Sequence, residues 1–133
     1  MPVLTGRNFE IRTSGGVADC RVWRRPDLSR EEGAKCGDEL CEALAALATS
    51  NQVKALVLDL HEAPPPGPLT QRAIERLMRA AETAARPVAV VCSSDALQRM
   101  QLRRIVTESA PKQGRVFEDG GEARTWVQNS PVR

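Results

Sequence analysis

The sequence predicts an α/β protein in which an N-terminal β-hairpin is followed by βα repeats. Two observations support this fold class: short apolar runs alternate with amphipathic helical patterns from Val53 to Trp126, and two short alternating runs lie near the N-terminus. Strand and helix in strict alternation require crossovers between parallel strands, so the sheet should be mostly parallel, with the hairpin as its antiparallel edge.

The hairpin is predicted by alternation on both sides of a glycine turn. Residues 9–12 and 18–22 each alternate apolar and polar side chains, and Ser14, Gly15 and Gly16 supply the turn between them. A helix should then start after Ser29, because Ser29 and Glu32 have the spacing of a capping box. Its apolar stripe follows helical spacing and consists of Leu40, Cys41, Leu44, Leu47 and Ala48.

Residues 53–60 are predicted to form the central strand, because six of these eight residues are apolar. The proline-rich residues 61–68 should form a loop, and Pro68 suits the first turn of the next helix, where its missing amide would have no partner. That helix carries a stripe of Ile74, Leu77, Met78 and Ala81. Residues 87–92 and 114–117 are the remaining parallel strands, and a last helix is expected from about Glu122 to Val127.

The helix predicted from Asp95 to about Ser109, capped by Ser93 or Ser94, is apolar on more than one side. Leu97 and Met100 point one way, and further apolar residues extend around the cylinder. The short C-terminal helix should cover only part of them. We therefore expect a symmetric homodimer whose face includes Leu102, Ile105 and Val106.

Composition limits the class of protein. The 133 residues suit one domain spanning residues 1–133, with residues 1–7 and 129–133 as flexible ends. A net charge of +2 and 3% aromatic residues predict no nucleic-acid partner. The N-terminus has no signal-peptide pattern, and no stretch approaches the roughly 20 apolar residues of a membrane span. The expectation is a cytoplasmic protein.

The four cysteines do not have the spacing of a metal site. Cys36 and Cys41 lie five residues apart on the first helix and should face different directions, at about 100° per residue. Cys20, Cys41 and Cys92 are expected to behave as small buried apolar residues, whereas Cys36 should tolerate serine. No metal and no cofactor are predicted.

Catalytic machinery is not apparent. Glycine-rich phosphate loops are absent, and His61, the one histidine, follows the central strand beside Glu62 with no nucleophile nearby. An enzyme using these two residues is the least favoured hypothesis. No catalytic residue is assigned, and the protein is not expected to be an enzyme.

A partner surface is predicted at the proline loop and the helix after it. The prolines have an ordinary explanation, since they stiffen a connection, but a pre-ordered loop also loses less entropy on binding. Arg72, Arg76 and Arg79 lie opposite the apolar stripe and offer either a solvated face or a guanidinium row for an acidic partner. The predicted partner-binding residues are Pro65, Pro66, Gly67, Thr70, Arg72 and Arg76.

From about Phe9 to Val127 the order of elements resembles the STAS and anti-sigma-factor-antagonist superfamily, with its SpoIIAA-like fold, and most of all its STAS/SEC14-like branch. The residues that carry the resemblance are 53–60, 86–91 and 115–127, whose ending is similar to the family's acidic Glu-Ala-x-x-Trp finish. The resemblance implies a protein that acts by binding, for instance to an anti-sigma-type kinase. Phosphorylated members accept phosphate at the start of the helix after the central strand. Here Thr70 is the candidate phosphoacceptor, in a stretch without the family's Asp and Ser.

The leading hypothesis is thus a non-enzymatic interaction or regulatory module, a component of a signalling partner switch. The alternative is a small carrier of an apolar ligand or lipid, of SEC14-like type, in which the helix from Asp95 to Ser109 shifts to admit the ligand.

Overall fold

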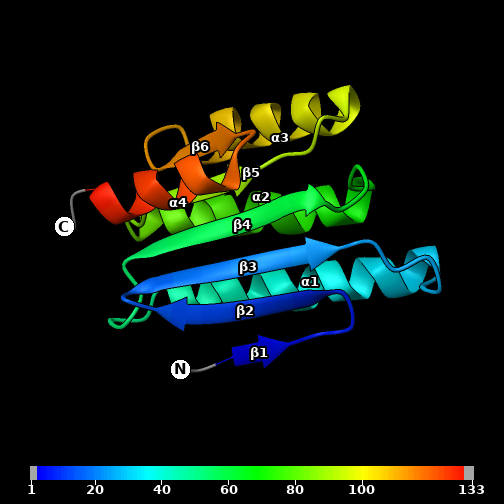
Figure 1. The fold of residues 1–133 in the computed structure, drawn as a ribbon, viewed down its shortest axis with the longest axis horizontal. Coiled ribbons are helices and arrows are strands. Elements are labelled where there is room, and N and C mark those ends of the chain that lie inside the picture. The colour runs from blue at the N-terminus through cyan, green and yellow to red at the C-terminus, as the bar shows by residue number, and fades with distance from the viewer. Residues whose placement is uncertain (1–2, 131–133) are drawn as a thin grey trace.

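The computed structural model describes residues 3–130, and within them six strands form one sheet flanked by four helices (Figure 1). The fold class is as predicted: a hairpin followed by βα units. The elements are β1 (Val3–Thr5), β2 (Phe9–Ser14), β3 (Val17–Trp23), α1 (Arg30–Ala48), β4 (Ala55–Glu62), α2 (Pro68–Thr83), β5 (Val88–Val91), α3 (Ala96–Ser109), β6 (Gly114–Phe117) and α4 (Gly120–Asn129).

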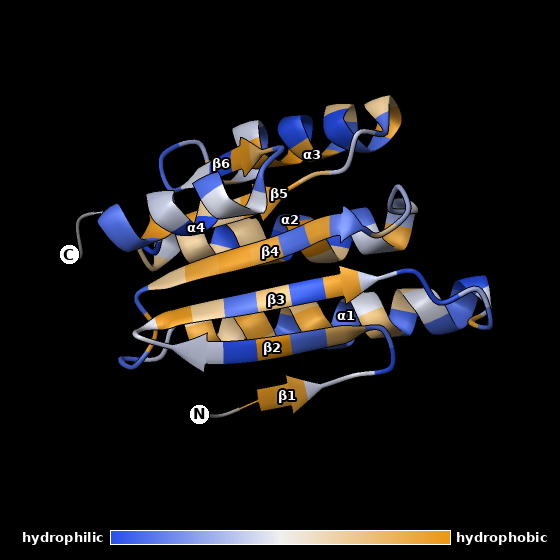
Figure 2. Cartoon of the chain, in the orientation of Figure 1, coloured by the Kyte–Doolittle hydropathy of each residue, from blue (hydrophilic) through white to orange (hydrophobic). Residues whose placement is uncertain are grey.

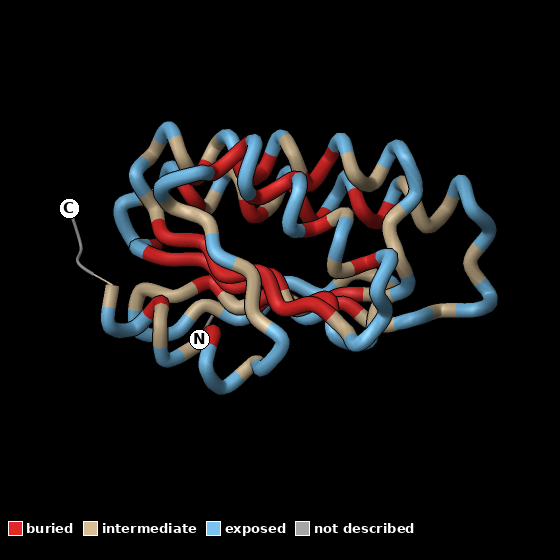
Figure 3. Tube along the Cα trace, turned by 90° about the horizontal axis from the view of Figure 1, so that it is seen from above, coloured by how far each residue is buried: buried red, intermediate tan, exposed pale blue. Residues whose placement is uncertain are grey.

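The strands lie in the sheet in the order of the sequence, β1 to β6. The pairs β1–β2 and β2–β3 are antiparallel, and the pairs β3–β4, β4–β5 and β5–β6 are parallel. Because successive crossovers of one hand advance in one direction, they leave their helices on one face of the sheet. Accordingly α1, α2 and α3 cover one face and α4 lies on the other (Figures 1 and 3).

The two faces of the sheet have cores of different size. Side chains such as Leu56 and Leu58 point into the large core beneath α1, α2 and α3, whereas Val57 points into a small core beneath α4. Hydrophilic residues alternate with apolar ones along β2 and β3 (Figure 2), and the charged residues among them lie outside the large core. A single ten-residue helix cannot cover six strands, so charged side chains occupy the remainder: Glu10, Arg12 and Arg21.

The N-terminal segment differs from the sequence-based expectation of a flexible end. Val3–Thr5 form the edge strand β1 and pair with β2 in the register Val3 to Arg12. Three residues carry too little periodicity to reveal a strand, but the free edge of β2 offers backbone groups to pair with. At the other end α4 continues to Asn129, and residues 1–2 and 131–133 lie outside the described part of the chain.

The predicted dimer face on α3 is wrong. Leu102 and Ile105 are 0% exposed and Val106 is 5% exposed, all within one chain, while Leu97 and Met100 are 50% and 64% exposed. The polar residue Gln98 takes a fully buried position on α3, and this sets the phase of the buried stripe. One continuous stripe at helical spacing therefore faces the sheet and α2: Gln98, Leu102, Ile105, Val106 and Ser109.

The helix starts follow local chemistry. Ser29 and Glu32 form the predicted capping box of α1, and Pro68 occupies the first turn of α2. At α3 the cap is Asp95, whose carboxylate accepts the amide of Gln98 at 3.0 Å, rather than Ser93 or Ser94. Asp and Ser are equally favourable N-cap residues, so the point at which α3 begins relative to the sheet determines which of them caps it.

Candidate functional site

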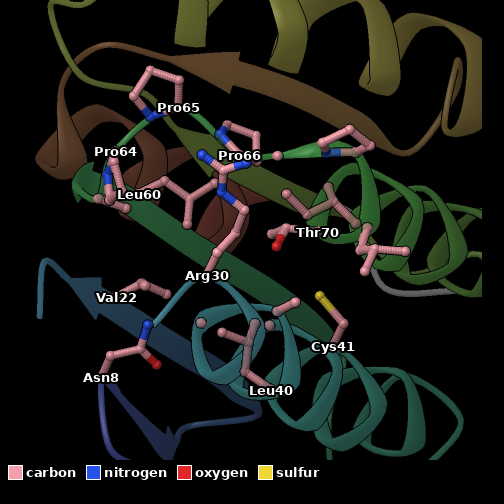
Figure 4. A pocket seen from close by; sticks show the side chains of 18 of the residues that line it. Asn8, Val22, Arg30, Leu40, Cys41, Leu60, Pro64, Pro65, Pro66 and Thr70 are labelled. Atoms are coloured by element: carbon pink, nitrogen blue, oxygen red, sulfur yellow. The ribbon is translucent and has the colours of Figure 1, made fainter. Parts of the chain in front are cut away.

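A pocket of about 370 Å³ lies between α1 and α2 at the carboxyl end of β4, beneath the proline loop (Figure 4). Strands β3 and β4 provide its floor through Val22, Leu58 and Leu60. Its volume falls in the range of small-molecule sites, and most of its wall is aliphatic. The other apolar or small residues that line it include Gly33, Ala34, Gly37, Leu40, Cys41, Ala63, the four prolines 64, 65, 66 and 68, Leu69 and Ile74.

The pocket exists because α1 presents small residues where it faces α2. Gly33, Ala34 and Gly37 line the wall without side chains long enough to fill the space. At Gly37 the two helices come close, since a Cβ there would lie 3.2 Å from the Thr70 side chain. Toward the start of α1 the small residues leave the cavity open.

The roof of the pocket is the loop after β4, and two glutamines fix it. The Gln98 amide nitrogen donates to the carbonyl oxygens of Leu60 at 2.9 Å and Ala63 at 3.0 Å, and its oxygen accepts the amide of Ser93 at 2.6 Å. Gln71 donates to the carbonyl of Pro66 at 3.0 Å. With prolines restricting φ, the roof is pre-ordered.

Gln98 is the residue of this site that the sequence analysis missed. It is 0% exposed and connects the roof to the start of α3. A glutamine in a helical stripe is ordinarily assigned to the solvent side, so only its position opposite the carbonyls of Leu60 and Ala63 reveals the role.

The structure places Thr70 in the first turn of α2, half-buried, with its hydroxyl directed into the pocket (Figure 4). Pro65, Pro66 and Gly67 also line the pocket. Four of the six predicted partner-binding residues therefore come together around one cavity. Whether Thr70 accepts phosphate stays a prediction.

The two remaining predicted residues, Arg72 and Arg76, lie outside the pocket. Both are exposed on α2, and Arg76 pairs with Asp38 of α1 at 3.0 Å. Leu69, which lines the pocket and is 59% exposed, precedes both arginines in the sequence. An exposed pair of this kind contributes little to stability, so these arginines remain available as a surface.

His61 and Glu62 are exposed at the end of β4. The backbone amide of His61 donates to the carboxylate of Asp59 at 3.1 Å, and no described side chain bonds to the imidazole. Within residues 3–130 no group of three or more His, Cys, Asp or Glu side chains is placed to hold a metal ion. The helices among those residues are all too short or too polar to cross a membrane.

All four cysteines are buried and free in the described structure, including Cys36, which was not among the three expected to be buried. Cys36 is only 3% exposed, so the prediction that it tolerates serine loses its basis. Cys41 lines the pocket, and burial raises its pKa to about 12. Burial also raises the pKa of Cys20. These thiols are therefore protonated near neutral pH and are poor nucleophiles.

We expect the buried Cys41 thiol to make the protein sensitive to alkali. Its folded pKa lies above its unfolded value of 9.0, so its contribution to stability is complete below about pH 9 and is lost as pH rises toward about 12. Urea unfolding measured across this window should show a steeper loss of free energy of unfolding for the wild type than for Cys41→Ala. Equal slopes for the two proteins would contradict this assignment.

A second polar cluster lies on the α4 face of the sheet. The Arg124 guanidinium of α4 donates to Asp19 of β3 at 2.6 and 2.9 Å and to Asp59 of β4 at 3.1 Å. The side chains are about one quarter exposed or less, and the two carboxylates raise the pKa of Arg124. Because the cation and both anions are engaged with one another, the cluster holds α4 on the sheet.

Comparison with known proteins returned no match to a family model, a curated protein or a solved structure. The fold and the pocket are therefore the grounds for assigning a function.

Proposed function

We propose that this protein is a non-enzymatic binding module of STAS/SEC14-like type, and that its pocket between α1 and α2 binds a small apolar ligand. One observation carries the proposal: a pre-ordered, largely aliphatic cavity of about 370 Å³ at the carboxyl end of the sheet. The pocket lies between α1 and α2, whereas the sequence-based alternative expected a shift of α3 to admit the ligand. The sequence resemblance to a family of binding proteins supports the same class.

Hydrophobic burial is large enough to drive such binding. Each methylene transferred from water contributes about 0.8 kcal/mol, so eight buried methylenes contribute about 6 kcal/mol before the costs of association. Because Gln98 and Gln71 already order the roof, little additional entropy is lost when a ligand enters.

Filling the pocket tests the proposal, with decanol as a neutral apolar probe. We expect isothermal titration calorimetry to detect decanol binding to the wild type, and Ala34→Phe to weaken it at least about tenfold, because the ring occupies the cavity that Ala34 leaves open. Ala46→Phe is the matched control, since Ala46 is exposed on the same helix and does not line the pocket.

Two outcomes would reject the ligand-binding proposal: no decanol binding to the folded wild type, or equal weakening by Ala34→Phe and Ala46→Phe. Circular dichroism of each variant establishes that it is folded.

A second candidate is a protein-interaction surface, supported by the exposed Arg72 and Arg76 beside the exposed Leu69. These residues suit an acidic partner such as an anti-sigma-type kinase, and phosphate on Thr70 would place charge at the pocket mouth. The double variant Arg72→Glu/Arg76→Glu separates the two functions. It should abolish binding to an acidic partner while leaving decanol affinity unchanged.

A further inference from the structure

We infer that the ligand of this pocket is a medium-chain monocarboxylate, with its chain among the aliphatic residues and its carboxylate at the guanidinium of Arg30. The inference rests on the proposed function and adds the chemical class of the ligand. Three features support it: the position of Arg30 and the absence of a partner for its guanidinium among the described residues, the charges at the pocket mouth, and the size of the cavity.

Arg30 is the cation at the pocket. It lines the cavity from the first turn of α1, and its side chain extends across the opening toward Pro66 (Figure 4). Within residues 3–130 its guanidinium takes part in no hydrogen bond or ion pair, although the neighbouring capping residue Glu32 is paired with Arg7 at 2.9 Å. A cation at the start of a helix is also disfavoured by the helix dipole. An anionic ligand would offset both features.

The remaining polar groups at the mouth favour an anion of low charge. Among the described lining residues Glu31 is the one carboxylate, and it is exposed. Thr70 and Asn8 line the pocket with a hydroxyl and an amide that can donate to an oxygen. With one guanidinium and one carboxylate present, a single negative charge is matched better than the larger charge of a phosphate monoester.

The cavity sets the length of the chain. A volume of about 370 Å³ divided by about 30 Å³ for a water-sized group gives room for about twelve such groups. A straight or branched acid of about eight to twelve carbons fits this space, whereas a lipid with two long chains does not.

Calorimetry with a matched pair of probes tests the inference: decanoate and decanol have the same chain and differ in the head group. We expect the wild type to bind decanoate at least about tenfold more tightly than decanol, a difference of about 1.4 kcal/mol. Arg30→Gln should remove this preference, so that its affinities for decanoate and decanol lie within about twofold of each other. Lys35→Gln is the matched control, because Lys35 is an exposed cation on the same helix outside the pocket.

The outcomes separate this inference from the proposed function. Equal affinity of the wild type for both probes, or a decanoate preference that survives Arg30→Gln, would overturn the role of Arg30 and leave the apolar pocket in place. Equal effects of Arg30→Gln and Lys35→Gln would show nonspecific electrostatics and would likewise overturn it. No binding of either probe would reject the proposed function itself. Unchanged melting temperatures of both variants would show that the exposed substitutions leave the fold intact.

Discussion

Replacing Gln98 with leucine should lower the free energy of unfolding by about 2 kcal/mol or more, because each buried polar group left without a partner costs about 1 to 3 kcal/mol. The change would remove the partners of two backbone groups, the carbonyl of Ala63 and the amide of Ser93, and one of the two donors to the carbonyl of Leu60, which still accepts the Ala63 amide at 3.1 Å. Leucine adds apolar contacts that offset part of the loss. Urea unfolding monitored by circular dichroism measures the difference.

The same helix provides a matched control in Gln101. Its side-chain oxygen is buried without a hydrogen-bond partner, so Gln101→Leu should be neutral or slightly stabilising. If Gln98→Leu destabilised the protein no more than Gln101→Leu does, the role of Gln98 would be wrong. Because Gln98 also holds the pocket roof, its loss should weaken decanol binding at temperatures where the variant is folded.

The second large effect is expected at Arg124. Arg124→Met keeps the aliphatic stem but leaves Asp19 and Asp59 without their shared cation, and it should lower the free energy of unfolding by about 2 to 4 kcal/mol. The estimate lies below that for a fully buried pair because the side chains retain some exposure. Guanidinium chloride is unsuitable for this measurement since it screens charge, so urea is the denaturant of choice.

A second substitution tests the cause of the loss. If repulsion and desolvation of the unpaired carboxylates are responsible, adding Asp19→Asn to Arg124→Met should recover part of the stability, whereas Asp19→Asn alone should be destabilising. Additive effects of the two substitutions would argue against coupling between these side chains. Arg115→Met, an exposed arginine of β6, serves as the control for a general loss of positive charge.

Most of the fold could be predicted from the sequence because its determinants are local. The capping box at Ser29 and Glu32, the proline at the start of α2 and the alternation in the hairpin each act over a few residues. The continuous apolar run of β4 likewise indicates a strand covered on both faces. The phase of α3 could not be predicted in this way, since Gln98 is buried by bonds to a loop 35 residues and more away in the sequence.

The candidate site was predicted in part. Pro65, Pro66, Gly67 and Thr70 are neighbours in the sequence and were identified as a surface, but the cavity they roof also needs Val22 of β3 and Ala34 of α1. Arg124 and Asp19 lie 105 residues apart in the sequence, and no local pattern predicts their ion pair.

The sequence by itself thus determined the elements from β2 onward, their order and the mostly parallel sheet, because propensity, capping and periodicity are short-range properties of the chain. Only the tertiary structure decided that α3 buries Leu102, Ile105 and Val106 within one chain, that a glutamine holds the loop, and that small residues of α1 leave a pocket against α2. The physical reason is that packing and buried hydrogen bonds depend on contacts between residues far apart in the sequence. Those contacts form only when the helices pack onto the sheet.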